Sequence, residues 1–130
     1  MVVVDASVLV RALGNDDRPG EAARRRLRGE SLLAPELVDV EVVSAFRQLL
    51  SRDELSPQRV AQALADLRRV PLRRVSHREL TLRCWELRDD LTPYDAAYVA
   101  VAELFGVPLL TADASLARAP GINCVVEVVG

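Results

Sequence analysis

The chain has 130 residues, half of them apolar and only 4% aromatic, with a formal net charge of −2 at pH 7. This length suits a single domain with one hydrophobic core, and the charge excludes a protein that coats polyanions through a general positive field. All 17 basic residues are arginine, so the absence of lysine excludes every mechanism that needs a lysine amine.

The N-terminal quarter predicts a strand, two helices and a second strand. Met1–Val4 is a continuous valine-rich run, typical of a buried strand. Ala6–Leu13 follows as a short helix, and Glu21–Arg28 has the spacing of an exposed helix that Gly29 ends. Ser31–Ala34 is the second expected strand.

The middle of the chain is mainly helical. Glu36–Arg52 has the apolar periodicity of a strongly amphipathic helix. Ser56 and Pro57 supply an N-cap and a first-turn proline for a helix over Gln58–Val70. A third strand is expected at Leu72–Val75.

The last third repeats the alternation of helix and strand. Ser76 and Glu79 form a capping box for a helix that runs to about Arg88, and a second helix is expected over Pro93–Phe105. The remaining elements are a strand, a short helix and a final strand, at Val107–Thr111, Ala114–Arg118 and Ile122–Val129. Strands that alternate with helices predict an α/β fold, with a central parallel sheet flanked by helices on both faces. We expect one domain over residues 1–130.

The remaining composition points to a soluble cytoplasmic protein. Cys84 and Cys124 lie far apart in apolar settings and are expected to be reduced thiols within the core. The N-terminal apolar run meets Asp5 and lacks a basic segment, so it is not a signal peptide. No apolar stretch approaches the ~18 residues of a membrane span.

Four acidic residues occupy positions where a ligand site is expected. Asp5 and Asp113 directly follow predicted strands, and ligands of open α/β sheets gather at the carboxyl ends of the strands. Asp95 lies in the first turn of one helix, and Glu41 borders the apolar stripe of another. The first three also have a simpler explanation, because Asp5 and Asp113 can cap helices and Asp95 can complete a capping box with Thr92. Glu41 has no such explanation.

Four carboxylates at one edge of a sheet repel one another. Two charges ~4 Å apart interact by roughly 4 kcal/mol at an effective dielectric constant near 20. A divalent cation such as Mg²⁺ or Mn²⁺ relieves this repulsion, prefers oxygen ligands, and lowers the pKa of a bound water. The acids therefore indicate metal-dependent phosphoryl chemistry.

Four stretches of the chain resemble the acidic motifs of PIN domains, in the same order. They are Val2-Val3-Val4-Asp5-Ala6-Ser7, Pro35-Glu36-Leu37-Val38-Asp39-Val40-Glu41-Val42, Thr92-Pro93-Tyr94-Asp95-Ala96-Ala97-Tyr98-Val99-Ala100 and Leu110-Thr111-Ala112-Asp113-Ala114-Ser115-Leu116. The third is the most specific. Together with the length, the set resembles the VapC toxins of toxin–antitoxin pairs.

This resemblance implies an activity, a cofactor and partners. It implies endonucleolytic cleavage of RNA that depends on Mg²⁺ or Mn²⁺, commonly in a homodimer, and a VapB-type antitoxin that blocks the acidic site. Asp5, Asp95 and Asp113 would be metal ligands, and Glu41 would bind a metal or orient the attacking water. The hydroxyls of Ser7 and Thr111 would support the carboxylates.

The remaining candidates are weaker, and rival functions stay open. Arg11, on the helix after Asp5, is the best candidate for an RNA-phosphate contact. Trp85 is expected in the core or a dimer interface, and Tyr94 and Tyr98 are expected to pack with a partner for each hydroxyl. Phosphoaspartate chemistry is rejected because it relies on a lysine. The serious alternative is a catalytically inert PIN-like module that only binds RNA or protein.

Overall fold

The computed structural model describes residues 1–130 as a five-stranded parallel sheet surrounded by helices. The strands have the order β3-β2-β1-β4-β5, and every neighbouring pair is parallel. Their bounds are β1 Val2–Val4, β2 Leu32–Pro35, β3 Leu72–Val75, β4 Leu109–Thr111 and β5 Val126–Val128. The helices are α1 Ala6–Gly14, α2 Arg18–Leu27, α3 Val38–Ser51, α4 Pro57–Leu67, α5 Thr81–Glu86 and α6 Pro93–Phe105, with 3₁₀ turns at His77–Glu79 and Leu116–Arg118.

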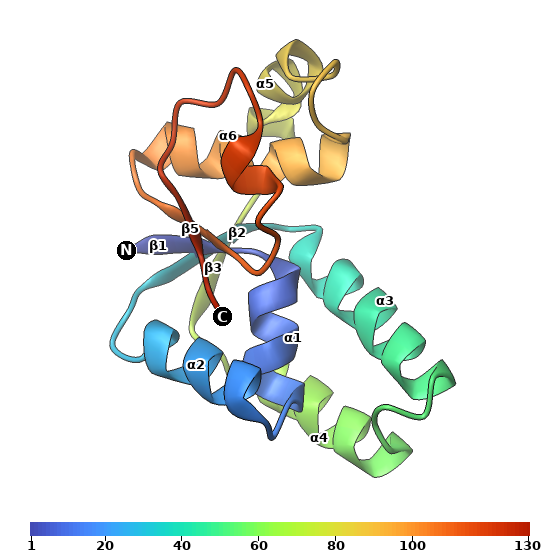
Figure 1. Ribbon diagram of the computed structural model, residues 1–130. Helices are drawn as coiled ribbons and strands as arrows, with labels where there is room; N and C mark the ends of the chain where they lie inside the picture. Colours follow the sequence, from blue (N-terminus) through green and yellow to red (C-terminus); the bar gives the residue numbers. More distant parts are fainter.

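The helices form two layers, one on each face of the sheet, as the alternation of elements predicted. Helices α5 and α6 cover one face, and helices α1 to α4 lie on the other side (Figure 1). β1 lies at the centre because it pairs with both β2 and β4, and its valines are almost completely buried. The strand order reverses direction at β1, so the connections on its two sides diverge and leave a crevice at its carboxyl end.

Aliphatic side chains make up most of the core, as the low aromatic content required. Val3, Val4, Leu33, Leu109 and Leu110 are at most 1% exposed and fill the centre of the sheet. Burying a Val or Leu side chain stabilises a fold by ~1.5–3 kcal/mol. This rigid centre fixes the positions of the residues that follow β1 and β4.

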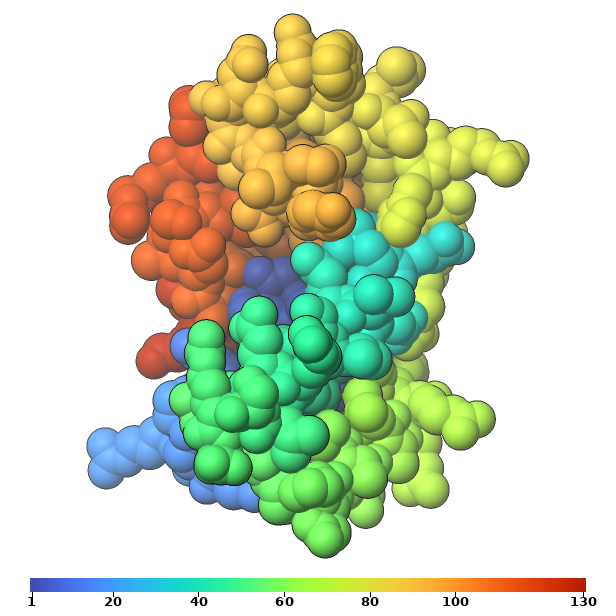
Figure 2. Space-filling view, turned by 90° about the vertical axis from the view of Figure 1, so that its right-hand side faces the viewer, coloured from blue at the N-terminus to red at the C-terminus, as the bar shows by residue number.

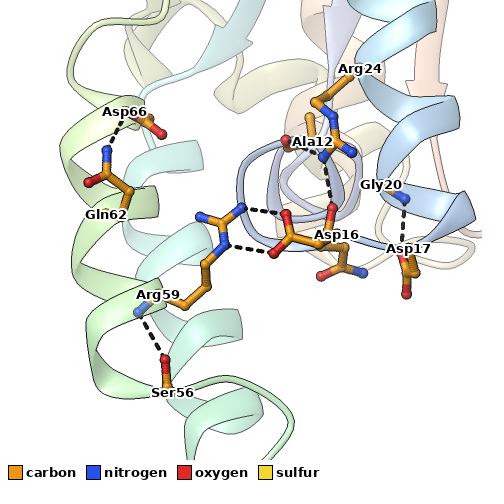
Figure 3. Close-up of polar contacts among 10 residues, drawn as sticks. Ala12, Asp16, Asp17, Gly20, Arg24, Ser56, Arg59, Gln62 and Asp66 are labelled. Atoms are coloured by element: carbon orange, nitrogen blue, oxygen red, sulfur yellow. Dashed lines mark hydrogen bonds and ion pairs between the residues drawn. The ribbon is translucent and has the colours of Figure 1, made fainter.

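Hydrogen bonds and ion pairs join helices α1, α2 and α4 at the protein surface. The guanidinium of Arg59 in α4 donates two hydrogen bonds of 3.1 Å to the carboxylate of Asp16, in the turn between α1 and α2 (Figure 3). Arg24 in α2 donates to the carbonyl oxygens of Ala12, at 3.1 Å, and Asn15, at 2.7 Å. These contacts place α1, α2 and α4 as one unit beneath the sheet.

The amino terminus begins at the edge of the sheet opposite the crevice. The amine of Met1 lies 3.4 Å from the Glu30 carboxylate, which also pairs with Arg26. Arg26 pairs in addition with Glu127 of β5. The start of β1, the end of α2 and the last strand are therefore linked by one group of ion pairs.

Several predicted elements are shorter than the sequence suggested. β5 is formed only by Val126–Val128, and residues Leu116–Arg118 form a 3₁₀ turn rather than an α-helix. The helix expected from Ser76 is broken at Leu80 into a 3₁₀ turn and α5. Trp85 does not lie in the core, because its side chain is 66% exposed, and its place in a dimer interface stays a prediction. The thiols of Cys84 and Cys124 are free and half-buried.

No helix is both long enough and apolar enough to cross a membrane.

Candidate active site

Asp5 lies at the carboxyl end of the central strand and is buried. Its backbone continues the pairing of β1 with β4, since its N–H donates to the Leu110 carbonyl at 3.1 Å. Its Oδ1 accepts the backbone N–H of Val8 at 3.2 Å, and it is thereby the N-cap of α1. The same oxygen accepts the Ser7 hydroxyl at 2.5 Å. The capping role that sequence reasoning offered as an alternative is real, and it holds the carboxylate in a fixed orientation.

Asp113 extends the neighbouring strand beyond the same edge of the sheet. Its backbone N–H donates to the hydroxyl of Thr111, the fully buried last residue of β4, at 3.0 Å. Its Oδ1 accepts both the hydroxyl and the backbone N–H of Ser115, at 2.7 and 2.9 Å. The side chain is exposed, and its second oxygen receives no hydrogen bond from the protein.

Glu41 comes from α3, whose register places its side chain beside the buried stripe of Val38 and Val42. Burying this carboxylate requires a partner, and the partner is Tyr98 of α6. The Tyr98 hydroxyl donates to Oε1 of Glu41 at 2.5 Å, and the Tyr98 side chain is only 2% exposed. No protein group donates to Oε2.

Asp95 is the third residue of α6, which Thr92 caps by accepting the Asp95 backbone N–H at 3.1 Å. Pro93 fits the first turn because its missing N–H is not needed there. The cap fixes the start of α6 and places the half-buried Asp95 side chain among the other acids.

Electrostatic repulsion acts among the carboxylates of Asp5, Glu41 and Asp95. Burial raises the pKa of Asp5, and the negative charge of Asp95 adds to the rise, although hydrogen bonds from Ser7, Thr111 and Val8 oppose it. Burial also raises the pKa of Glu41, which the charges of Asp95 and Asp5 raise further.

The coupling extends from Asp95 to Asp113. The pKa of Asp95 is raised by burial and then by the charge of Asp113. The pKa of Asp113 itself is lowered by the two hydrogen bonds from Ser115 and by the positive charge of Arg118. Repulsion therefore links all four acids, and Asp113 is the one that ionises most readily.

No arginine forms an ion pair with any of the four acids. Elsewhere in the protein, seven carboxylates do pair with arginine, namely those of Asp16, Glu21, Glu30, Asp39, Glu86, Glu103 and Glu127. Asp39 shows the contrast most directly, because it lies two residues from Glu41 in α3 and is bound by both Nε and Nη2 of Arg74. Unlike Asp39, Glu41 and the three other clustered acids have no arginine as a counter-charge.

The donor set fits a hard divalent cation. All four side chains offer carboxylate oxygens, and Glu41 and Asp113 each keep one oxygen without a protein partner. No three acidic, histidine or cysteine side chains lie close enough together to make a ready-formed cage. An oxygen-only donor set of this kind suits a hard divalent cation that takes one or two carboxylates and completes its shell with water and phosphate oxygens.

The segments that carry the four acids surround an open hollow of the surface. Figure 2 shows the N-terminal segment (dark blue) at its floor, between the starts of α3 (teal) and α6 (orange) and the segment after β4 (red-orange). The five principal cavities of the protein lie elsewhere, and none is lined by any of the four acids. An open site of this kind admits a polymer from the side.

The other predicted residues have mixed outcomes. Ser7 and Thr111 both contact the acids, as described. Arg11 is half-buried, and its guanidinium donates to the Val129 carbonyl at 3.2 Å. One of its N–H groups is therefore already bonded to the C-terminal segment. Tyr98 has the expected hydroxyl partner, but Tyr94 is 60% exposed and has none.

The sequence pattern did not connect Tyr98 to the site. It left Glu41 without a capping explanation and indicated that the Tyr98 hydroxyl needs a partner, but it did not join the two residues. They lie 57 positions apart, and no local spacing rule brings α3 and α6 together. Side-chain chemistry could have suggested the pair. Glu41 has no basic residue close to it in the sequence, and a tyrosine hydroxyl can donate a hydrogen bond to a carboxylate in place of a cation.

Comparison with known proteins places the chain in a family. The model of the PIN domain matches residues 2–122. Ribonuclease VapC12 of Mycobacterium tuberculosis is 40% identical over 129 residues, which cover 99% of each chain.

Two solved structures share the fold at lower identity. The M. tuberculosis toxin VapC20, described as cleaving the sarcin-ricin loop, superposes with a TM-score of 0.70 at 18% identity, covering 96% of this chain and 98% of that one. A toxin–antitoxin complex from Klebsiella pneumoniae gives a TM-score of 0.66 at 20% identity, with 98% and 97% coverage. With its parallel sheet, its four acids and these similarities, the chain belongs to the PIN-domain family, among the VapC ribonucleases.

Proposed function

We propose that this protein is an endoribonuclease that depends on Mg²⁺ or Mn²⁺ and acts as the toxin of a VapBC-type pair. The observation that carries the proposal is the group of four coupled carboxylates without an arginine partner, in a chain that pairs seven other acids with arginine. Its similarity to a ribonuclease and to an RNA-cleaving toxin of M. tuberculosis supports the same activity.

The proposed roles of the acids are those that the resemblance to PIN domains implies. Asp5, Asp95 and Asp113 would hold the cation, and Glu41 would hold it or orient the attacking water. A cation bound there supplies positive charge for the phosphate and acidifies a water. The protein holds Asp5 and Asp113 rigidly at the ends of β1 and β4, so little reorganisation is needed during the reaction. Hydrolysis forms a bond from phosphorus to the water oxygen and breaks one P–O bond of the RNA backbone.

The proposed partners are RNA, a VapB-type antitoxin and a second copy of the chain. The open recess suits a polymeric substrate, and its negative charge requires basic groups on a protein that covers it. The similarity to a toxin chain from a toxin–antitoxin complex supports an antitoxin of this type. The resemblance to VapC toxins supports the homodimer.

The test is cleavage of RNA by purified protein with Mg²⁺, Mn²⁺ or EDTA, in wild type and in Glu41→Gln. We expect cleavage with either cation, loss of cleavage in EDTA, and a fall of at least 100-fold in Glu41→Gln. Asp39→Asn is the matched control, since it removes an acid from the same helix turn that is already paired with Arg74. Cleavage that continues unchanged in EDTA would refute the metal dependence.

An inert binding module predicts different results. Such a protein would bind RNA without cleaving it, in every cation tested. Melting with and without millimolar Mn²⁺ tests the site directly, because a cation that binds only the folded state raises the melting temperature. No shift in the wild type, together with no cleavage, would favour the inert module.

A further inference from the structure

Tyr98 is the one uncharged side chain that reaches Glu41 from a different layer of the fold. Glu41 lies on α3 on one side of the sheet, and Tyr98 lies on α6 on the other. Their hydrogen bond of 2.5 Å therefore joins the two layers at the carboxyl edge of the sheet. Neither residue has another side-chain partner at this distance.

The surroundings of Tyr98 hold its hydroxyl in place as a hydrogen-bond donor. The ring is 2% exposed and is packed within the core. A tyrosine hydroxyl is a hydrogen-bond donor near neutral pH, so its hydrogen is available to the Glu41 carboxylate.

The hydrogen bond uses only one oxygen of Glu41. Oε1 accepts the Tyr98 hydroxyl, and Oε2 has no protein donor. A carboxylate fixed through one oxygen has lost its rotational freedom, yet it still presents the other oxygen to an external ligand. An arginine pair would have occupied both oxygens and cancelled the charge, as Arg74 does at Asp39.

We propose that Tyr98 is a positioning residue of the active site, which holds Oε1 of Glu41 so that Oε2 is set for the divalent cation or the attacking water. This inference rests on the proposed ribonuclease function. Groups that support a ligand in this way typically change metal affinity or activity by 10–100-fold when they are removed. Tyr98 acts through Glu41 and touches no reacting atom itself.

The test compares Tyr98→Phe with wild type, Glu41→Gln and the double variant Tyr98→Phe/Glu41→Gln. Phenylalanine keeps the buried ring and removes only the hydroxyl, so the fold is retained. We expect the Mn²⁺ dissociation constant, measured by calorimetry or by the EPR signal of free Mn²⁺, to rise about 10-fold or more in Tyr98→Phe. We expect kcat for RNA cleavage to fall by about the same factor, with KM unchanged.

The double variant separates positioning from packing. If Tyr98 acts through Glu41, adding Tyr98→Phe to Glu41→Gln has no further effect on Mn²⁺ affinity or on kcat. A general packing role would reduce both by the same factor in either background. Tyr94→Phe is the matched control on the same helix, because its hydroxyl has no protein partner, and it should match the wild type.

The possible results separate this inference from the proposed function. One result would contradict the inference alone. In that case the wild type cleaves RNA and Glu41→Gln does not, but Tyr98→Phe binds Mn²⁺ and cleaves as the wild type does. The inference is then wrong and the proposed function stands. If the wild type neither binds Mn²⁺ nor cleaves, the proposed function fails first. Should Tyr98→Phe melt at a lower temperature without metal, binding is measured well below that temperature, where both proteins are folded and their Mn²⁺ affinities remain comparable.

Discussion

Ser7 and Asp5 are joined by a hydrogen bond of 2.5 Å in which the serine hydroxyl donates to Oδ1 of the acid. The same hydroxyl oxygen accepts the backbone N–H of Ala112, just beyond β4, at 3.0 Å. One small side chain therefore fixes the carboxylate at the end of β1 and the backbone that leads to Asp113. The distance between these two acids depends on it.

The variant Ser7→Ala removes both contacts at once. We expect a loss of about 1–3 kcal/mol in the free energy of unfolding, because a carboxylate and a backbone N–H lose a partner together. Cleavage should fall about 10–100-fold, as for other groups that orient a metal ligand. Chemical denaturation and single-turnover cleavage measure the two effects. Ser51→Ala, at the exposed end of α3, serves as the control and should leave cleavage unchanged.

The pH dependence of stability without metal tests the burial of Asp5. An acid whose pKa is raised by folding stabilises the fold fully below its unfolded pKa, and this contribution is lost as the pH rises through the folded pKa. The Asp5→Asn side chain does not ionise, so its contribution to stability does not fall as the pH rises. In EDTA, the variant should therefore gain stability relative to wild type as the pH rises from the ordinary carboxyl value of 3.8 toward neutrality.

For Asp113→Asn we expect the opposite change in stability with pH, which makes it the control. Hydrogen bonds from Ser115 lower the pKa of Asp113, so its ionised form stabilises the fold above its unfolded pKa, and this contribution is lost as the pH falls through the folded pKa. The variant should lose stability at neutral pH and match the wild type in acid. Melting curves from pH 3 to pH 8 would contradict the account if both variants changed in the same direction.

Gly20 tests how closely α2 approaches the turn that precedes it. A Cβ atom at this position would lie 2.0 Å from the carbonyl oxygen of Asn15, and a backbone atom cannot move aside cheaply. Gly20→Ala should therefore destabilise the fold by about 1–3 kcal/mol. Because α2 lies away from the acids, kcat of the folded fraction should be unchanged. Glu21→Ala, at the next and exposed position, should lower stability by no more than about 0.5 kcal/mol.

Arg11 remains a predicted contact for an RNA phosphate. Its bond to the Val129 carbonyl uses one N–H, and a guanidinium has five. Arg11→Ala should raise KM for RNA with little change in kcat, and should reduce the slope of log binding against log salt by about 1. Arg68→Ala, directly after α4, is the control. An equal effect of both variants would mean that Arg11 contributes only to the overall charge.

The sequence predicted the positions of the four acids better than the bounds of the outer helices and strands, for physical reasons. Asp5 and Asp113 follow short buried strands, and parallel strands bring their carboxyl ends to one edge, so a local pattern sufficed. Glu41 stood out because a carboxylate beside an apolar stripe requires an explanation. The pairing of Glu41 with Tyr98 was not predictable in this way, since it depends on how two helices pack across the sheet.

The errors at the periphery have a common origin. β5 is an edge strand with a neighbour on one side only, so an apolar run from Ile122 to Val129 forms only three paired residues. Trp85 of α5 and Tyr94 of α6 carry large aromatic rings, which favour burial in the core, yet both are exposed on the surface of the single chain. Hydrophobicity alone does not specify which apolar residues a small sheet can cover.

The seven ion pairs between side chains of acids and bases are all made by guanidinium groups, because the sequence has no lysine. An amine-reactive dye therefore reacts with no side chain of the fold, and it leaves these ion pairs and the clustered acids untouched. For the same reason, cellular enzymes that acylate lysine side chains find no acceptor on this protein.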